Sequence, residues 1–362
     1  MESGRTRSAL RLVLACTSAL ALAHCALIVG FESSYSVAGP NDGGSADGRS
    51  TDDATSPGEG AGGFGAPIVI ATGEDPPFGG IAALNETVYW THAGIDGGVR
   101  SVAKDGGVVT TVAVAQRQGL VGEIFGIPGG TIHWLEEQGD CSRKTRCGFS
   151  GEGGYTQCGS RAQRLRTDGH RLYVLLDEAV ATTKHPIQVL STSCPMPEPG
   201  PRLYSDAGFV GYVNMSPDVS GNRVFALAGT NVDCLPVATG PTIHVVTGNV
   251  LDLVATDTHL FWLTPSELHR CRFGSDTACA PCTDEEVVTR TRSGTSPAIL
   301  LDGELLYWLV DDGIASIRTD ATSGSSATVI AKNQAAPAVL ALDKAGIYWA
   351  NGDGTIVRAP RN

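Results

Sequence analysis

The sequence predicts an all-β fold, and three observations support this prediction. The chain has 362 residues, of which 42% are hydrophobic and 18% are charged, so it can bury a sizeable core in one large domain or two ordinary ones. It contains 46 glycines but three methionines, which favours short strands and tight turns over a helical bundle. A run with an aromatic pair and an acidic or glycine-rich turn recurs, as in LLYWLVDDGIASIR and GIYWANGDGTIVR.

Residues 1–24 have the pattern of a secretory signal peptide. Three arginines precede an apolar stretch that runs from Leu12 to Ala23, and this order of charge and hydrophobicity is typical of export signals. The wording LAHC at Cys25 resembles a bacterial lipobox, whose cysteine is lipidated after cleavage; His24 stands where that pattern has Gly, Ala or Ser. Two alternatives remain open, namely cleavage to a soluble exported protein and an uncleaved anchor over residues 12–29, which is just long enough to span a bilayer.

Residues 25–65 are expected to form the lipid-attachment cysteine and a disordered tether. The segment from Ala38 to Gly65 is nearly free of large apolar residues and is rich in Gly, Ser, Asp and Pro, so it cannot bury enough apolar surface to become ordered. A G-x-G-x-x-G match begins at Gly58, but it follows no strand and opens no helix, so it does not predict a dinucleotide site. The folded domain is expected over residues 66–362.

The recurring aromatic pairs set a period for this domain. The spacings between successive pairs are 44, 40, 52, 36, 46 and 41 residues. A period in the low forties with about four strands per unit is the signature of a β-propeller, in which each unit is one blade. We predict seven four-stranded blades, or six if the cysteine-rich second unit is an insertion. The pairs are Tyr89-Trp90, His133-Trp134, Tyr173-Val174, Phe225-Ala226, Phe261-Trp262, Tyr307-Trp308 and Tyr348-Trp349.

The strands within a unit can be delimited from their turn residues. In the sixth unit PAILLDG, ELLYWLV, IASIRTD and ATVIAKN are bounded by Gly, Asp or Asn. The seventh unit lacks an outer strand, whereas PIVIATG (residues 67–73) stands alone before the first full unit and matches the outer strand TVIAKN. We therefore expect the N-terminal strand to complete the last blade and close the ring, which removes exposed sheet edges.

The Y-W pair followed by D-G-x-I-x-R resembles the YWTD-type and related extracytoplasmic propellers over roughly residues 66–362. Known YWTD propellers have six blades and bind proteins, so the resemblance implies a protein-binding propeller. In this chain Thr91-His92, Leu309-Val310 and Ala350-Asn351 follow the aromatic pairs. The leader, the C-x-L-I-V-x-F start and the acidic, glycine-rich spacer resemble those of myxobacterial-type cell-envelope lipoproteins.

Eight cysteines follow the leader, and in an exported chain an even number predicts disulfides. The second and fifth units hold three each, and the third and fourth hold one each. Because only neighbouring blades are close, we expect each group of three to form one internal disulfide. Its third cysteine should then bond to the single cysteine of the adjacent unit. A redox role for CAPC and a zinc site are weaker alternatives, since no helix follows and no second C-x-x-C is present. The cysteines are Cys141, Cys147, Cys158, Cys194, Cys234, Cys271, Cys279 and Cys282.

Charge and motifs restrict the function classes. The net charge of −12 argues against a nucleic-acid partner, which would require clustered Lys and Arg. No hydrolase, zincin or P-loop motif is present, and no catalytic residue is predicted. We expect a monomeric, non-enzymatic binding or scaffold propeller in the bacterial cell envelope, held to the membrane by its lipid only, or secreted. The alternative is a metal-dependent hydrolase or lyase of propeller type with its site at the central channel.

Acidic residues follow the second strand of several units, and these loops emerge on one face of a propeller. Turns are polar in any case, but carboxylates that converge on one face would attract a basic protein, a peptide or a polyamine, or hold a calcium ion. Apart from this possible Ca²⁺ we expect no cofactor. The predicted binding residues are Glu136, Glu137, Asp177, Glu178, Asp311, Asp312 and Asp353.

Overall fold

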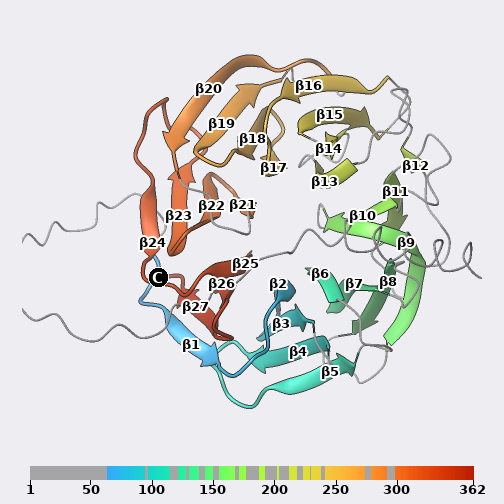
Figure 1. The fold of residues 1–362 in the computed structure, drawn as a ribbon, viewed down its shortest axis with the longest axis vertical. Coiled ribbons are helices and arrows are strands. Elements are labelled where there is room, and N and C mark those ends of the chain that lie inside the picture. The colour runs from blue at the N-terminus through green and yellow to red at the C-terminus, as the bar shows by residue number, and fades with distance from the viewer. Residues whose placement is uncertain are drawn as a thin grey trace, which may run out of the picture. The chain divides into compact units, whose positions relative to one another are not determined.

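The structure is a computed structural model, in which all regular elements of the described residues are β-strands (Figure 1). It describes residues 63–93, 97–114, 121–127, 130–137, 143–149, 155–167, 171–176, 187–191, 202–203, 212–217, 223–228, 230–237, 241–273, 279–291 and 298–362. The leader, Cys25 and most of the tether lie outside these residues. No helix in the described part is long and apolar enough to cross a membrane.

Four antiparallel sheets of four strands follow the chain order, from inner to outer strand. The first is β2 (Phe78–Leu84), β3 (Thr87–His92), β4 (Gly98–Ala103) and β5 (Thr110–Val114). The next are β13 (Tyr212–Pro217), β14 (Arg223–Ala228), β15 (Asn231–Pro236) and β16 (Ile243–Thr247), followed by β17 (Asp252–Ala255), β18 (His259–Leu263), β19 (Glu267–Arg272) and β20 (Thr283–Arg290). The fourth is β21 (Ile299–Asp302), β22 (Leu305–Val310), β23 (Gly313–Arg318) and β24 (Thr328–Ala331), the four strands expected for the sixth unit.

The second and third expected units are hydrogen-bonded as one seven-stranded sheet rather than as two. Its strands are β6 (Val121–Ile127), β7 (Thr131–Glu137), β8 (Arg143–Phe149), β9 (Tyr155–Thr167), β10 (Arg171–Leu176), β11 (Ile187–Ser191) and β12 (Arg202–Leu203). The 13-residue strand β9 pairs with β8 through its first half and with β10 through its second half. The outer strand of one unit therefore continues into the inner strand of the next without a break.

The last sheet joins both ends of the folded region. It consists of β25 (Pro337–Asp343), β26 (Gly346–Asn351), β27 (Ile356–Pro360) and the N-terminal strand β1 (Ile68–Ala71), in the order β1-β27-β26-β25. Strand β1 runs antiparallel to β27, with Val69 opposite Val357. Asn362 N also donates a hydrogen bond to Gly63 O at 2.8 Å. The N-terminal strand thus occupies the outer position that the seventh unit lacks.

The sheets follow one another around a common centre, with their inner strands nearest to it (Figure 1). Strand β2 contacts β6 on one side and β25 on the other, and β17 contacts β13 and β21. Close approach of the inner strands explains Gly80, because a Cβ there would lie 2.7 Å from the backbone nitrogen of Ile124. A side chain at this position of β2 would push β6 away.

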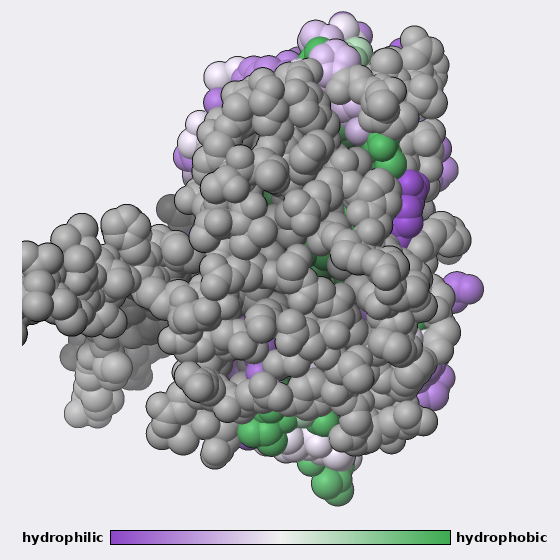
Figure 2. Space-filling view, turned by 90° about the vertical axis from the view of Figure 1, so that its right-hand side faces the viewer, coloured by the Kyte–Doolittle hydropathy of each residue, from purple (hydrophilic) through white to green (hydrophobic). Residues whose placement is uncertain are grey.

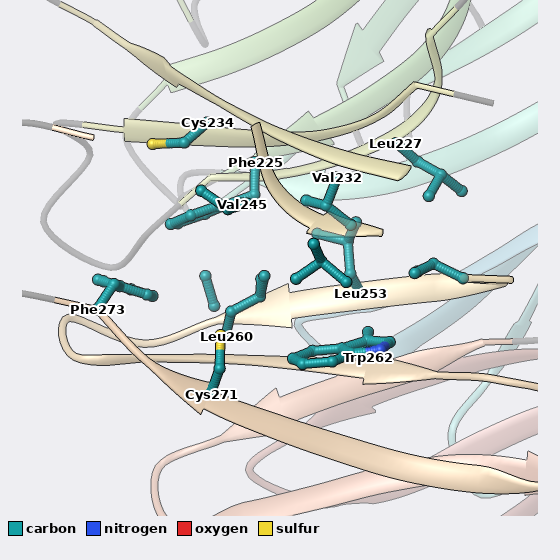
Figure 3. Close-up of a cluster of buried hydrophobic side chains, with 13 residues drawn as sticks. Phe225, Leu227, Val232, Cys234, Val245, Leu253, Leu260, Trp262, Cys271 and Phe273 are labelled. Carbon is teal, nitrogen blue, oxygen red and sulfur yellow. The ribbon is translucent and has the colours of Figure 1, made fainter. Parts of the chain in front are cut away.

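The two aromatic residues of each pair pack on opposite sides of their sheet, as alternation along a strand requires. Tyr348 shares a core cluster with Trp90, and Tyr307 shares one with Trp349. Between β13–β16 and β17–β20, Phe225 and Trp262 lie in the cluster drawn in Figure 3. The first aromatic residue of a unit therefore packs with the tryptophan of the following unit, which explains why the pair recurs. Tyr89 with Trp134 and Phe261 with Trp308 repeat the arrangement.

Two disulfides lie in the described residues, and both involve cysteines of the fourth and fifth expected units. Cys234 on β15 is bonded to Cys279, and Cys271 on β19 is bonded to Cys282. One bridge is internal to the fifth unit and the other reaches the single cysteine of the fourth, which is the arrangement that the parity argument predicts there. Cys141 and Cys194 lie outside the described residues, and only the backbone of Cys147 and Cys158 is described.

Large hydrophobic side chains that remain exposed in the described part lie on outer strands or beside them. Figure 2 shows hydrophobic surface at its lower end, the end at which Figure 1 draws β4 and β5. Val108 lies in the loop between β4 and β5 and Val114 lies at the end of β5, whereas Ile68 and Val69 lie on β1. Val329 on β24 is exposed as well, and the buried apolar side chains of the described part form clusters between neighbouring sheets rather than at the centre of the ring.

Candidate functional site

Three of the predicted acidic residues lie on exposed turns that a common segment connects. Asp311 and Asp312 form the β22–β23 turn, and Asp353 lies in the β26–β27 turn. The segment 332–336 contacts both turns, because Gln334 N donates to Asp312 O at 2.8 Å and Gly352 N donates to Ala335 O at 2.8 Å. The two turns are therefore held side by side.

The prediction for Glu136 is wrong in one respect, because this residue does not lie on a solvated rim. Strand β7 extends to Glu137 and places Glu136 opposite Lys144 of β8, and Glu136 is only 2% exposed. The strand continues two residues beyond the hydrophobic run, where the sequence was read as a loop. The side chain of Glu137 and all of Asp177 and Glu178 lie outside the described residues, so the structure does not test their predicted role.

An additional acidic residue, Asp75, belongs with these turns. It lies in the segment that connects β1 to β2, and it is exposed. Its neighbour Glu74 donates its backbone N–H to Gly354 O at 3.1 Å, which places the segment beside the β26–β27 turn. This position can be recognised in the sequence, since the segment after residues 67–73 corresponds to residues 332–336, which follow the matching outer strand of the sixth unit. We call Asp75, Asp311, Asp312 and Asp353 the acidic rim.

Polar side chains of these connecting segments hold the buried tryptophans. Glu74 Oε2 accepts hydrogen bonds from Trp90 Nε1 and from Arg100, each at 3.0 Å. Gln334 Oε1 accepts from Trp349 Nε1 at 3.0 Å, and Trp308 Nε1 donates to Thr291 Oγ1 at 2.8 Å. A buried indole N–H needs such an acceptor. The same contact recurs in three sheets, so it fixes each connecting segment, and with it the rim, to the core.

Charged side chains also meet at the centre of the ring, at positions that no motif in the sequence marks. Glu123 on β6 accepts hydrogen bonds from Arg164 (3.1 Å) and Arg166 (2.6 Å), both on β9, and from Leu165 N (2.8 Å). Burial acts to raise the pKa of Glu123, but the guanidiniums of Arg166 and Arg164 outweigh it and hold the pKa below its usual value. Glu123 is therefore an ionised carboxylate between two cations.

Asp252 on β17 completes this group, which we call the central charged cluster. Its Oδ2 accepts from Ile299 N of β21 at 3.0 Å and its Oδ1 from Leu253 N at 2.9 Å. Burial raises the pKa of Asp252, although Arg166 and the two N–H groups act in the opposite direction. Both carboxylates satisfy N–H groups of a neighbouring inner strand, which would otherwise form a free sheet edge.

The described residues contain no group of three or more His, Cys, Asp or Glu side chains that could hold a metal ion. Both carboxylates of the central charged cluster already accept two or more hydrogen bonds from protein donors. The arrangement at the centre suits the joining of inner strands, whereas the acidic rim presents carboxylates to solvent.

Comparisons with known proteins bear on the fold alone. No protein-family model matches the chain, and no curated protein matches it. Similar solved structures include virginiamycin B lyase from Staphylococcus aureus, with a TM-score of 0.57, 12% identity, and coverage of 82% of this chain and 98% of the lyase. The β-propeller domain of Cps50 (Swd1) from Myceliophteria thermophila has a TM-score of 0.56 at 10% identity, covering 82% of this chain and all of that domain.

The WD40 β-propeller domain of Doa1 is similar to the same degree, with a TM-score of 0.56, 13% identity, and coverage of 83% of this chain and 98% of that domain. These likenesses and the successive antiparallel sheets identify the fold as a β-propeller. They assign neither the YWTD-type family nor an activity.

Proposed function

We propose that this protein is a non-enzymatic binding or scaffold propeller that recognises a basic protein or peptide through the acidic rim. The observation that carries the proposal is that the rim carboxylates are exposed on turns which hydrogen bonds fix to one another and to the core. A surface that is already ordered loses little conformational entropy on binding. Clustered charges of one sign also accelerate encounters with a partner of opposite charge.

The central charged cluster favours this proposal over a metal-dependent hydrolase or lyase. A metal site needs carboxylate or imidazole groups that can turn toward the ion, whereas Glu123 and Asp252 are held by guanidinium and backbone donors. If Glu123 or Asp252 turned toward a metal ion, the buried N–H groups that they accept from would lose their hydrogen bonds.

The domain is a ring of seven blades, in which β9 serves two of them and β1 completes the last. This count assigns one blade to each aromatic pair, including the two blades within the seven-stranded sheet. Three contacts support closure: β1 with β27, β2 with β25, and Tyr348 with Trp90.

We further propose that the protein is anchored in the cell envelope through Cys25 and the tether expected over residues 25–65. Two or more acyl chains are needed for stable anchoring, as in bacterial lipoproteins. Substitution Cys25→Ser should release the protein from membranes and abolish labelling with palmitate. Absence of label in the wild type would contradict the anchor while leaving the binding proposal intact.

The binding proposal is tested on the full chain carrying Cys25→Ser. A lysine-rich peptide serves as the probe, together with a pull-down from envelope extracts. The rim variant carries Asn at positions 75, 311, 312 and 353, which preserves turn geometry while removing four charges. The control variant removes four exposed charges elsewhere, through Glu86→Gln, Asp257→Asn, Asp284→Asn and Glu285→Gln.

We expect salt-sensitive binding of the wild type and the control, and at least about 10-fold weaker binding of the rim variant, because each rim charge contributes to attraction over the Debye length. Equal binding of the rim and control variants, or binding that is insensitive to salt, would contradict the proposal.

A further inference from the structure

Exposed apolar side chains lie where the N-terminal strand meets the first sheet. Ile68 and Val69 on β1 are 51% and 53% exposed, and Val108 in the β4–β5 loop is 89% exposed. Ile68 is opposite Arg358 of β27, whose guanidinium donates to Asp105 Oδ1 in the same loop at 2.6 Å. The strand and the loop are therefore held side by side. We call Ile68, Val69 and Val108 the apolar edge.

Folding of the sheet does not require an apolar residue at position 68. By strand register, Thr110 on β5 and Thr328 on β24 occupy the position that Ile68 has on β1. Both threonines are exposed, and polar residues on an outer strand protect its open edge from unwanted pairing. An exposed isoleucine weakens this protection, so it indicates a surface that another apolar body covers.

The apolar edge lies near the point at which the N-terminal chain enters the folded domain. Gly65 N donates to Pro360 O at 2.7 Å, and Asn362 N donates to Gly63 O at 2.8 Å. These contacts are at the last residues of β27, whereas the β26–β27 turn with Asp353 precedes its first residue. The chain before residue 63 therefore joins the domain at the end of the last sheet that is opposite to the acidic rim.

We propose that the apolar edge rests on a phospholipid membrane surface. This inference depends on the proposed anchor at Cys25, because the anchored tether keeps the domain at a high local concentration beside the membrane. Tethering makes a second contact intramolecular, so a few apolar side chains suffice for it. The apolar edge thus adds a contact to the expected one through the lipid. The acidic rim faces away from the membrane, toward a soluble basic partner.

The charges beside the apolar edge are compatible with this contact. Both charged residues of the loop before Val108 have a counter-charge, since Lys104 is paired with Asp343 and Asp105 with Arg358. Contact of this loop with zwitterionic headgroups therefore leaves neither of its charges without a partner.

The test places a tryptophan in the apolar edge of the lipid-anchored protein. The five native tryptophans are at most 2% exposed, so Val108→Trp adds a reporter at the surface. The protein is reconstituted in phosphatidylcholine vesicles with brominated acyl chains, which quench a tryptophan that reaches the hydrocarbon. Val114→Trp is the matched control, because Val114 is 57% exposed and lies opposite Gly98, at the other end of the same two strands.

We expect quenching and a blue shift of the emission for Val108→Trp and neither for Val114→Trp, because one end of the sheet contacts the membrane and the other does not. Adding Ile68→Thr to Val108→Trp should lower the equilibrium constant for membrane contact at least about 4-fold, the change for one CH₂ group kept out of apolar surroundings. Adding Val329→Thr, at an exposed valine of β24, should leave the quenching unchanged.

Equal quenching of the Val108→Trp and Val114→Trp proteins, or none in either while the protein stays on the vesicles, would overturn the inference and leave the anchor intact. Emission of Val108→Trp that shifts to the blue without vesicles, as the protein concentration rises, would overturn it in favour of a second copy of the chain. Protein that leaves the vesicles contradicts the anchor and this inference with it. Binding of the lysine-rich peptide to the acidic rim is measured in solution and is unaffected by these outcomes.

Discussion

Two joints between neighbouring sheets are built differently. The sheet β17–β20 is joined to β13–β16 by the covalent bond between Cys234 and Cys279. The sheet β25–β27 with β1 is joined to β2–β5 without cysteine, through an ion pair between Lys104 and Asp343 and another between Arg358 and Asp105 at 2.6 Å. A disulfide reduces the number of conformations open to the unfolded chain, whereas ion pairs stabilise the folded state alone. The stability of the second joint should therefore depend more on pH and on single substitutions.

The second joint borders the sheet in which the two ends of the folded region pair, since β1 and β27 are neighbours there. Arg358 donates to Lys104 O at 3.1 Å, and Tyr348 OH donates to Asp343 Oδ1 at 3.3 Å. Strand β1 pairs with β27 and then continues through Glu74 to β2. This joint, which we call the terminal joint, therefore depends on a strand of four residues, and its strength can be compared directly with that of the disulfide joint.

The largest expected effect is the loss of the disulfide joint. Chain-entropy estimates give about 4 kcal/mol for a bridge that closes 45 residues and about 3 kcal/mol for one that closes 11. The double variant Cys234→Ala/Cys279→Ala should therefore lower the free energy of unfolding by about 1 kcal/mol more than Cys271→Ala/Cys282→Ala. Urea unfolding of both proteins measures the difference. A larger loss from the shorter loop would show that strain or packing outweighs chain entropy.

Strand β1 should be nearly as important to the terminal joint. Ile70 is 5% exposed and packs with Phe78 and Ile356, so Ile70→Ala should reduce stability by about 3 kcal/mol. Ile68 on the same strand is 51% exposed, and Ile68→Ala should change stability by less than about 0.5 kcal/mol. Thermal unfolding of the two variants separates them. Equal effects would mean that β1 does not pack as the structure has it.

The ion pair of the terminal joint should have a smaller effect. The Lys104 side chain is 6% exposed and that of Asp343 is 21% exposed, so Asp343→Asn leaves a largely buried ammonium without its counter-charge. We expect a loss of about 2 kcal/mol, below the range for fully buried pairs because Asp343 reaches solvent. Asp320→Asn, at a 68% exposed partner of Arg318, is the matched control and should change stability much less, because solvent screens this surface pair.

The smallest effect is a pH dependence at the terminal joint. Burial and the nearby Arg100 lower the pKa of His92, with Glu74 acting in the opposite direction. The unfolded chain therefore binds a proton more readily, so stability is lost as the pH falls below about 6.5, by at most about 1.4 kcal/mol per pH unit. His92→Gln should reduce this slope between pH 7 and pH 5 in urea titrations. Equal slopes for the wild type and His92→Gln would contradict this assignment.

The regular part of the fold could be predicted because its signals lie within short stretches of the sequence. Aromatic pairs, turn residues and a solitary strand before the first unit are all visible in a linear sequence, and β21–β24 and β1 lie where these signals place them. The continuity of β9 was missed, since a strand that changes partners halfway carries no turn signal. The reading of Glu136 as a loop residue failed because pairing with β8 extends β7 beyond its hydrophobic run.

The central charged cluster could not be predicted in the same way. Glu123, Arg164 and Asp252 lie on three inner strands, and each would suit a solvated strand edge when read alone. Their meeting depends on how the sheets are placed around the centre. Asp75 could have been found from the sequence, because the expected placement of residues 67–73 as the outer strand of the last blade aligns its connecting segment with residues 332–336.

The two residues of each pair pack into the cores on opposite sides of their sheet, which affects how units can be duplicated in evolution. Tyr307 packs with Trp349 and Tyr348 with Trp90, so each unit carries one half of the joint ahead of it and one half of the joint behind it. A duplicated unit would bring both halves along and would fit its neighbours at once, at either end of the copy. Where the second position is small, as with Ala226 beside Tyr173, one large ring still fills the gap. Tandem duplication or deletion of a whole unit therefore leaves the packing contacts between neighbouring sheets in place. The angle between sheets that closes the ring is then what limits the number of units.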